Sequence, residues 1–148
     1  LLLWTALALA PADRGTWWLE NLLPLSLVVL LAGTWRHWPL SDGAYAMAAG
    51  FLALHAVGAH WGYPHVPAGW WLRDLFHAAG WPTTRNPYDR VVHFAFGALL
   101  LRPTAEALRR VVWRRRAATA LAVATLLAAA GLYEVLEWGA ARLLAGPA

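Results

Sequence analysis

The sequence predicts an all-α, polytopic bundle of transmembrane helices, and two observations lead to that class. Of 148 residues, 60% are hydrophobic and the mean hydropathy is +0.46, whereas ordinary globular chains are roughly 45–50% apolar. The apolar residues also gather in about five long stretches, and a helix is the default spanning element because it satisfies its own backbone groups in lipid. These stretches are residues 1–10, 22–35, 44–61, 91–108 and 117–144.

The first stretch sets an expectation about the start of the chain. Residues 1–10 make up roughly half of the ~20 residues that a spanning helix needs, and the chain begins with Leu1 rather than Met. We therefore expect a truncated first spanning helix. The sequence contains no internal repeat, so we expect residues 1–148 to form a single integral membrane domain.

A further helix is expected between the third and fourth stretches. Over residues 68–79, helical spacing places Trp70, Trp71 and Leu75 on an apolar face and Arg73 and Asp74 among polar positions. This pattern predicts a short amphipathic helix that lies on the membrane surface. Most of the eleven tryptophans fall at expected span ends or in connections, as in the aromatic belts of membrane proteins.

The charged residues indicate lipid as the partner rather than nucleic acid. The net charge is +4, and all twelve basic residues are arginine, a residue that gathers in cytoplasmic loops and at lipid headgroups. Five arginines within residues 109–116 place that connection in the cytoplasm. Glu106 can pair with Arg102 and Arg110 at i±4. The chain has no cysteine, which excludes disulfides and thiolate zinc sites.

The feature most informative about function is a set of ionisable residues within the apolar stretches, where such groups are costly and usually functional. Counting ~1.5 Å per residue, three helices carry a histidine or carboxylate at one level, towards the outer leaflet. The second stretch opens with Glu20 on the same side. The candidates for catalysis are His60, Asp89, His93, Glu134 and Glu137, and those for substrate binding are Arg85, Asn86, Arg90 and Glu20.

Four interpretations of this set remain open. The residues can form a buried polar network that holds the helices together. They can also hold a divalent metal such as zinc, manganese or iron, for which the candidate ligands are His55, His60, His93 and Glu134. His55 is the weaker ligand because it lies about 140° around the helix from His60. The remaining interpretations are a metal-free acid/base or headgroup site with Arg85 and Arg90 holding an anion, and a proton path.

Three ordered motifs carry a resemblance to a known family. They run from His55 to Tyr63, from Arg85 to Phe94 and from Tyr133 to Trp138, and residues 18–21 add to them. Together they resemble the YjdF-like inner-membrane family, a bacterial family of unknown function. The resemblance implies a multi-pass protein of the bacterial inner membrane. The family pattern continues into a further acidic segment, so it also implies that a last helix and part of the site lie beyond Ala148.

A more distant similarity is to VanZ-like membrane proteins, which also have an aspartate, a basic residue and a histidine at the start of one helix. Here these are Asp89, Arg90 and His93, and the later Tyr-Glu pair is Tyr133-Glu134. Neither resemblance supplies a reaction. We expect either an enzyme acting on a lipid-linked or envelope substrate, or a non-enzymatic subunit or scaffold of a larger membrane complex.

Overall fold

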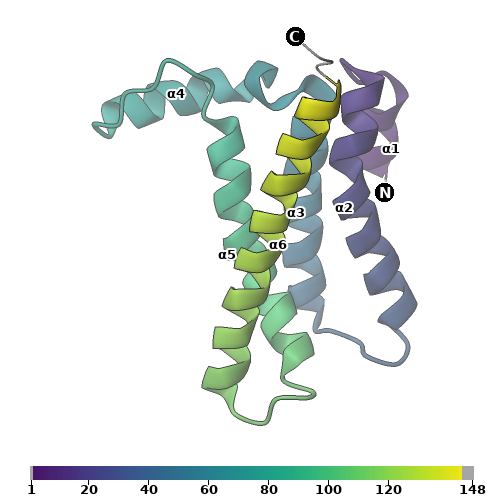
Figure 1. The fold of residues 1–148 in the computed structure, drawn as a ribbon. Coiled ribbons are helices and arrows are strands. Elements are labelled where there is room, and N and C mark those ends of the chain that lie inside the picture. The colour runs from purple at the N-terminus through teal and green to yellow at the C-terminus, as the bar shows by residue number, and fades with distance from the viewer. Residues whose placement is uncertain (1, 145–148) are drawn as a thin grey trace.

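The protein is an all-helical bundle in the computed structural model, which describes residues 2–144 and contains no strand among them. Four long helices run side by side, and a shorter helix projects sideways from one end of the bundle (Figure 1). The predicted all-α class is confirmed. In chain order the elements are α1 (Leu2–Leu9), α2 (Arg14–Thr34), α3 (Asp42–Trp61), the 3-10 turn η1 (Tyr63–His65), α4 (Ala68–Ala78), α5 (Tyr88–Leu108) and α6 (Arg115–Leu144).

Three of these helices are long and apolar enough to cross a membrane, namely α2, α5 and the Arg115–Gly139 part of α6. With eight residues, α1 extends only about 12 Å. The central helix α3 has twenty residues, but alanine and glycine make up much of its apolar character. The count of five hydrophobic segments is therefore not confirmed. Leu1 and Ala148, the ends at which truncation is expected, lie outside the described residues.

The connection between α1 and α2 is shorter than the apolar stretches of the sequence predicted, because α2 begins at Arg14 rather than near residue 22. The Asp13 carboxylate caps α2 by accepting a hydrogen bond of 2.6 Å from the Thr16 amide, and this bond lowers the pKa of Asp13. The Arg14 guanidinium donates to the carbonyls of Ala8 and Leu9 at the end of α1. The connection between the first two helices is therefore limited to residues 10–13.

Small residues hold the centre of the bundle together. Ala44 and Ala48 on α3 are buried, as are Ala118 and Ala122 on α6, and α5 packs extensively against both helices. Small side chains let helix backbones approach closely, which favours association in lipid. The larger core residues are Phe51, Val66, Tyr88, Val92 and Leu100.

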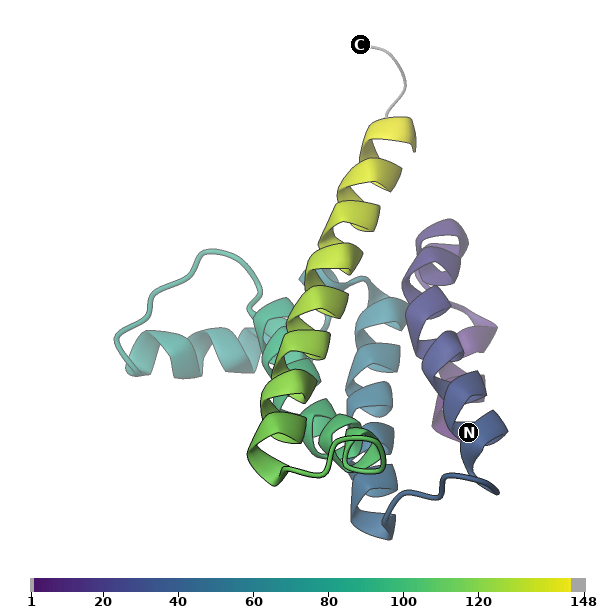
Figure 2. The same ribbon diagram turned by 60° about the horizontal axis from the view of Figure 1, so that its bottom comes forward.

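The helix expected over residues 68–79 is present as α4 (Ala68–Ala78). Both views show α4 pointing away from the other helices (Figures 1 and 2). Its side chains Trp71 and Leu75 are exposed, and the Arg73 guanidinium lies over the Trp70 ring at 4.7 Å from its centroid. The connection between α5 and α6 lies at the opposite end of the bundle (Figure 1).

Candidate functional site

A histidine on α5 lies between two carboxylates from two helices. The His93 Nδ1 atom is 3.1 Å from Asp89 Oδ1, one turn earlier on α5, and its Nε2 atom is 3.3 Å from Glu134 Oε1 on α6. Nδ1 is also 3.1 Å from the Asp89 carbonyl oxygen. All of these partners accept hydrogen bonds, so the ring can donate to both sides only when both nitrogens are protonated. Asp89, His93 and Glu134 therefore form one polar contact group.

This group stands at one end of a groove of about 420 Å³. Helices α3 and α5 form the floor of the groove, while α2 and α6 form its walls and do not pack extensively against each other. Its polar end is lined by His55, Tyr63, Asp89, His93, Tyr133 and Glu137. The Glu137 carboxylate lies within electrostatic reach of His93, Asp89 and Glu134, and Glu20 on α2 lies within reach of Glu137 and Asp89.

The remainder of the groove is apolar. Its α2 wall contains Leu23, Leu27 and Leu30, which share one helical face, and Pro24 and Ser26 line it as well. The α6 wall and the floor contribute Leu126, Ala129, Ala130, Phe96 and Leu100, with Thr104 and Thr125 farther along. The groove thus combines one polar end with a long apolar channel.

A second histidine, His55, belongs to the polar end through a tyrosine. The Tyr63 hydroxyl lies 2.7 Å from His55 Nδ1, and His55 Nε2 lies 3.0 Å from the backbone carbonyl of Glu20. Because a carbonyl oxygen can only accept, His55 carries its proton on Nε2 and the Tyr63 hydroxyl donates to Nδ1. Burial, followed by the nearby negative charge of Glu20, raises the pKa of Tyr63 far above its ordinary value. Tyr63 therefore remains a donor.

The Tyr63 ring also explains a glycine on α3. A Cβ atom built on Gly58 would meet the Tyr63 ring at 2.5 Å, well inside ordinary contact distance. The ring therefore packs directly against the helix backbone at this position. Residue type alone did not identify Tyr63 and Tyr133 as part of the polar end, although both occur in the motifs that carry the family resemblance.

His60, in contrast, lies away from this group. Its Nδ1 atom is 2.7 Å from the Leu7 carbonyl oxygen on α1, and its ring stacks edge-on against Trp61. The 140° separation of His55 and His60 around α3 places one residue toward the groove and the other toward α1. The expected order of the two is reversed, since His55 lines the groove and His60 does not.

The predicted substrate-binding residues just before and at the start of α5 also lie outside the lining of the groove. The Asn86 side chain donates to the Val66 carbonyl at 2.9 Å and accepts from the Tyr88 amide at 3.0 Å, so it fastens the start of α5 to the start of α4. Arg85 and Arg90 are exposed. Within residues 2–144, neither arginine lies within ion-pair distance of a carboxylate.

The set expected to ligate a metal does not converge. Within the described part of the chain, no group of three or more histidine, aspartate or glutamate side chains is arranged to hold a metal ion. His60 faces α1, while the two nitrogens of His55 are engaged by Tyr63 and Glu20. The residues therefore do not fit the zinc, manganese or iron site predicted from His55, His60, His93 and Glu134.

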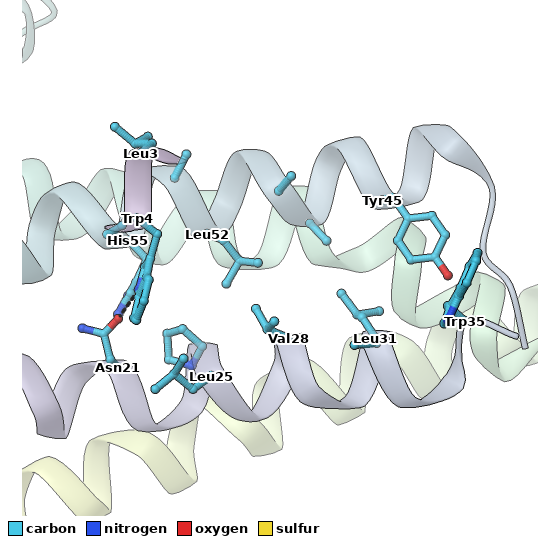
Figure 3. A pocket seen from close by; sticks show the side chains of 16 residues that line it. Leu3, Trp4, Asn21, Leu25, Val28, Leu31, Trp35, Tyr45, Leu52 and His55 are labelled. Carbon is cyan, nitrogen blue, oxygen red and sulfur yellow. Dashed lines mark hydrogen bonds between the residues drawn. The ribbon is translucent and has the colours of Figure 1, made fainter. Parts of the chain in front are cut away.

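A second cavity, of about 560 Å³, lies between α2 and α3. Figure 3 shows Trp4 and Asn21 at one end of it and Trp35 and Tyr45 at the other. The buried Asn21 accepts a hydrogen bond from the Trp4 indole at 2.8 Å and donates to the Trp17 carbonyl at 2.8 Å. The bond from Trp4 joins α1 to α2, whereas the bond to Trp17 lies within α2. The rest of the cavity lining is almost entirely apolar.

At the opposite end of the bundle, Glu106 serves a role that the sequence did not indicate. Its carboxylate accepts hydrogen bonds from the Ser41 amide at 2.5 Å and the Ser41 hydroxyl at 2.7 Å. Ser41 is the N-cap of α3, so Glu106 ties α5 to the beginning of α3. The expected ion pairs with Arg102 and Arg110 are absent from the described residues, and Arg110 donates to the Pro39 carbonyl instead.

Comparisons with known proteins agree with the helical, apolar character of the chain. A family model described as predicted membrane protein (DUF2238) matches residues 1–148. The inner membrane protein YjdF of Escherichia coli (strain K12) is 30% identical over 131 residues, which are 87% of this chain. The chain spans 60% of the length of that relative. No solved structure matches the chain significantly.

Proposed function

The chain belongs to the DUF2238 family of predicted membrane proteins, and from that premise we propose that its groove is an acid/base site for a lipid-borne substrate. The single observation that carries this proposal is the position of His93. Its two ring nitrogens lie 3.1 and 3.3 Å from carboxylates on two different helices, at the polar end of the groove. Imidazole is the commonest general acid or base in enzymes, and here its orientation is set by contacts on both ring nitrogens.

The surrounding groups support a division of roles. Asp89 and Glu134 orient the His93 ring through contacts to its two nitrogens. The ring is the candidate for proton exchange with a hydroxyl or amine of the bound molecule. The hydroxyls of Tyr63 and Tyr133, which line the same end, are candidates for hydrogen bonding to that polar group. His55 acts as a positioning residue, because it accepts the hydrogen bond of Tyr63.

The shape of the groove supports a substrate that arrives from the bilayer. Its walls, α2 and α6, are both candidate spanning helices, and they leave the groove between them. A lipid-linked molecule would enter between α2 and α6, placing its chain along Leu23, Leu27 and Leu126. Only its polar group would then reach the imidazole of His93.

We further propose the arrangement in the membrane that this function requires. The apolar parts of α1 and α3 complete the bundle of hydrophobic segments, and α4 lies in the interface with Trp71 and Leu75 in contact with lipid. The arginine-rich connection between α5 and α6 faces the cytoplasm. In that orientation the polar end of the groove lies at the outer leaflet.

The alternative is a non-enzymatic scaffold in which the same contacts only tie α5 to α6. The variants His93→Gln and Glu134→Gln can separate the two functions. The matched control is His37→Gln, because His37 is an exposed histidine that is remote in sequence from His93. Purified protein would be placed in nanodiscs of total bacterial lipid extract, and each lipid species would be followed over time by mass spectrometry. Thermal unfolding of the same samples reports stability.

We expect the wild type to deplete at least one lipid species. His93→Gln should slow that depletion by roughly 10²–10⁴-fold, the usual contribution of a general acid or base. Glu134→Gln, which removes an orienting carboxylate, should slow it less, and His37→Gln should match wild type. Constant lipid composition with the wild-type protein would overturn the acid/base proposal. A loss of stability in both variants, without any lipid turnover by wild type, would favour the scaffold.

A further inference from the structure

The residues that line the groove also indicate which class of ligand it binds. We infer that the groove binds an amphiphile whose polar group is a primary amine and whose aliphatic chain lies between α2 and α6. This inference rests on the proposed acid/base function. The inference depends on two properties of the groove. These are the sign of the charge at its polar end and the apolar character of the remainder.

The polar end is rich in carboxylates. Asp89 and Glu137 line the groove directly, Glu134 contacts His93 from α6, and Glu20 is near enough to Asp89 and Glu137 to interact with their charge. The basic side chains that line the described groove beside these four carboxylates are the imidazoles of His93 and His55, with no arginine among them. An anionic group would add like charge beside these carboxylates, whereas an ammonium would relieve their repulsion.

The hydrogen-bonding capacity of the same end also matches an amine. A primary ammonium has three N–H donors and no acceptor. The groups at this end offer carboxylate oxygens from Asp89 and Glu137 and hydroxyl oxygens from Tyr63 and Tyr133. One Glu20 oxygen, Oε2, is buried and has no hydrogen-bond partner. Acceptors thus outnumber donors around the polar end.

The positions of the arginines argue against a phosphate group. Phosphate recognition normally uses arginine or lysine donors, and the chain contains no lysine. Arg85 and Arg90, the arginines nearest in sequence to Asp89, are exposed, and within residues 2–144 neither forms an ion pair. Among the described residues, therefore, no arginine forms an ion pair with the carboxylates of the groove.

The apolar part has the dimensions of a chain-binding channel. The whole groove, with its polar end included, has a volume of about 420 Å³, which falls within the roughly 300–1,000 Å³ of small-molecule sites. From His93 to Leu100 the floor extends roughly 10 Å at 1.5 Å per residue, and the channel continues to Thr104. Leucine and alanine walls along this distance suit an aliphatic chain.

The test uses two photo-crosslinking probes with the same diazirine-bearing twelve-carbon chain, one ending in a primary amine and the other in phosphate. Each is added to the protein in phosphatidylcholine nanodiscs, and labelled peptides are mapped by mass spectrometry. We expect the amine probe to label the groove-lining segments of α2 and α6 at least tenfold more than the phosphate probe. Asp89→Asn combined with Glu137→Gln should abolish that preference, whereas Asp74→Asn, on the exposed surface of α4, should not.

A second variant tests the inference in case the double substitution prevents folding. Ala130→Phe narrows the apolar channel without removing any charge, and it should reduce labelling by the amine probe. Equal labelling by the two probes, or a preference that survives the double substitution, would overturn the inference. The lipid-turnover assay above is independent, so loss of the amine preference with turnover intact refutes the ligand class and not the acid/base function.

Two sources of the amine remain distinguishable within the same experiment. Adding phosphatidylethanolamine to the nanodiscs should suppress labelling if the natural ligand is a lipid headgroup with a primary amine. Labelling that is insensitive to phosphatidylethanolamine, but is displaced by unlabelled dodecylamine, indicates a free amphiphilic amine. Either result supports the shared amine chemistry.

Discussion

Replacing Gly69 by alanine tests whether Asn86 is a structural brace between α4 and α5. A Cβ atom on Gly69 would lie 1.6 Å from Asn86 Oδ1, against an ordinary contact of at least 3.4 Å. The amide group would have to move by roughly 2 Å to relieve that overlap. Such a shift breaks both of its hydrogen bonds, to the Val66 carbonyl and from the Tyr88 amide, because hydrogen bonds extend only to about 3.2 Å.

The cost follows from those two bonds. Leaving a buried donor or acceptor unsatisfied costs about 1–3 kcal/mol, and water at this end of the bundle can replace part of the loss. We expect Gly69→Ala to destabilise the protein by about 2–4 kcal/mol, which lowers the midpoint of thermal unfolding by roughly 5–15 °C at this chain length. The measurement is thermal unfolding in detergent or nanodiscs.

The matched control is Gly131→Ala on α6, where a Cβ atom would meet nothing within 4 Å. It should leave stability unchanged or raise it by up to about 1 kcal/mol, through helix propensity. A double-mutant cycle sharpens the test. Once Asn86→Ala has removed the brace, Gly69→Ala should add no further cost, so the coupling energy should equal the whole effect of the glycine substitution. Additive losses in the cycle would refute the reasoning.

Two further predictions concern polar contacts elsewhere in the bundle. Because burial raises the folded-state pKa of Tyr63 above its ordinary value near 10, the stability that its hydroxyl provides is present below about pH 10 and is lost as pH rises further. Tyr63→Phe should therefore be less stable than wild type at pH 7 and lose less stability between pH 9 and 11; parallel pH curves of thermal unfolding would contradict this. Glu106→Ala removes both carboxylate oxygens that accept hydrogen bonds from Ser41, and it should lower the free energy of unfolding by about 1–2 kcal/mol. Glu106→Gln keeps one side-chain oxygen, so it should lower that free energy less. Equal losses on chemical unfolding would argue against the capping role.

Long apolar stretches were sufficient to identify the fold class and most helices. The short helix α4 was predicted from the spacing of Trp70, Trp71 and Leu75, and the structure places it at Ala68–Ala78. The start of α2 was not predictable in the same way. The segment before residue 22 lacked a long apolar run, but the Asp13 cap and the packing of Trp17 against Trp4 of α1 make it helical.

Spacing within one helix also predicted that Asp89 and His93 share a face, because four residues make about one turn. It could not determine which residues of other helices they meet. The rotation of α3 decides that His55 lines the groove while His60 faces α1, and the rotation of α6 decides that Glu134 reaches the His93 ring.

Sequence alone was enough to identify a helical membrane protein with ionisable groups near one end of its helices. Those properties follow from hydropathy and from the constant rise of a helix, which are local. The packed structure was needed to show that His93 lies between two carboxylates, that the metal ligands expected from the sequence diverge, and that Asn86 braces a connection. Each of these depends on how helices rotate and pack against one another, and that packing is set by small residues such as Ala44 and Ala48 on α3, acting across the whole bundle.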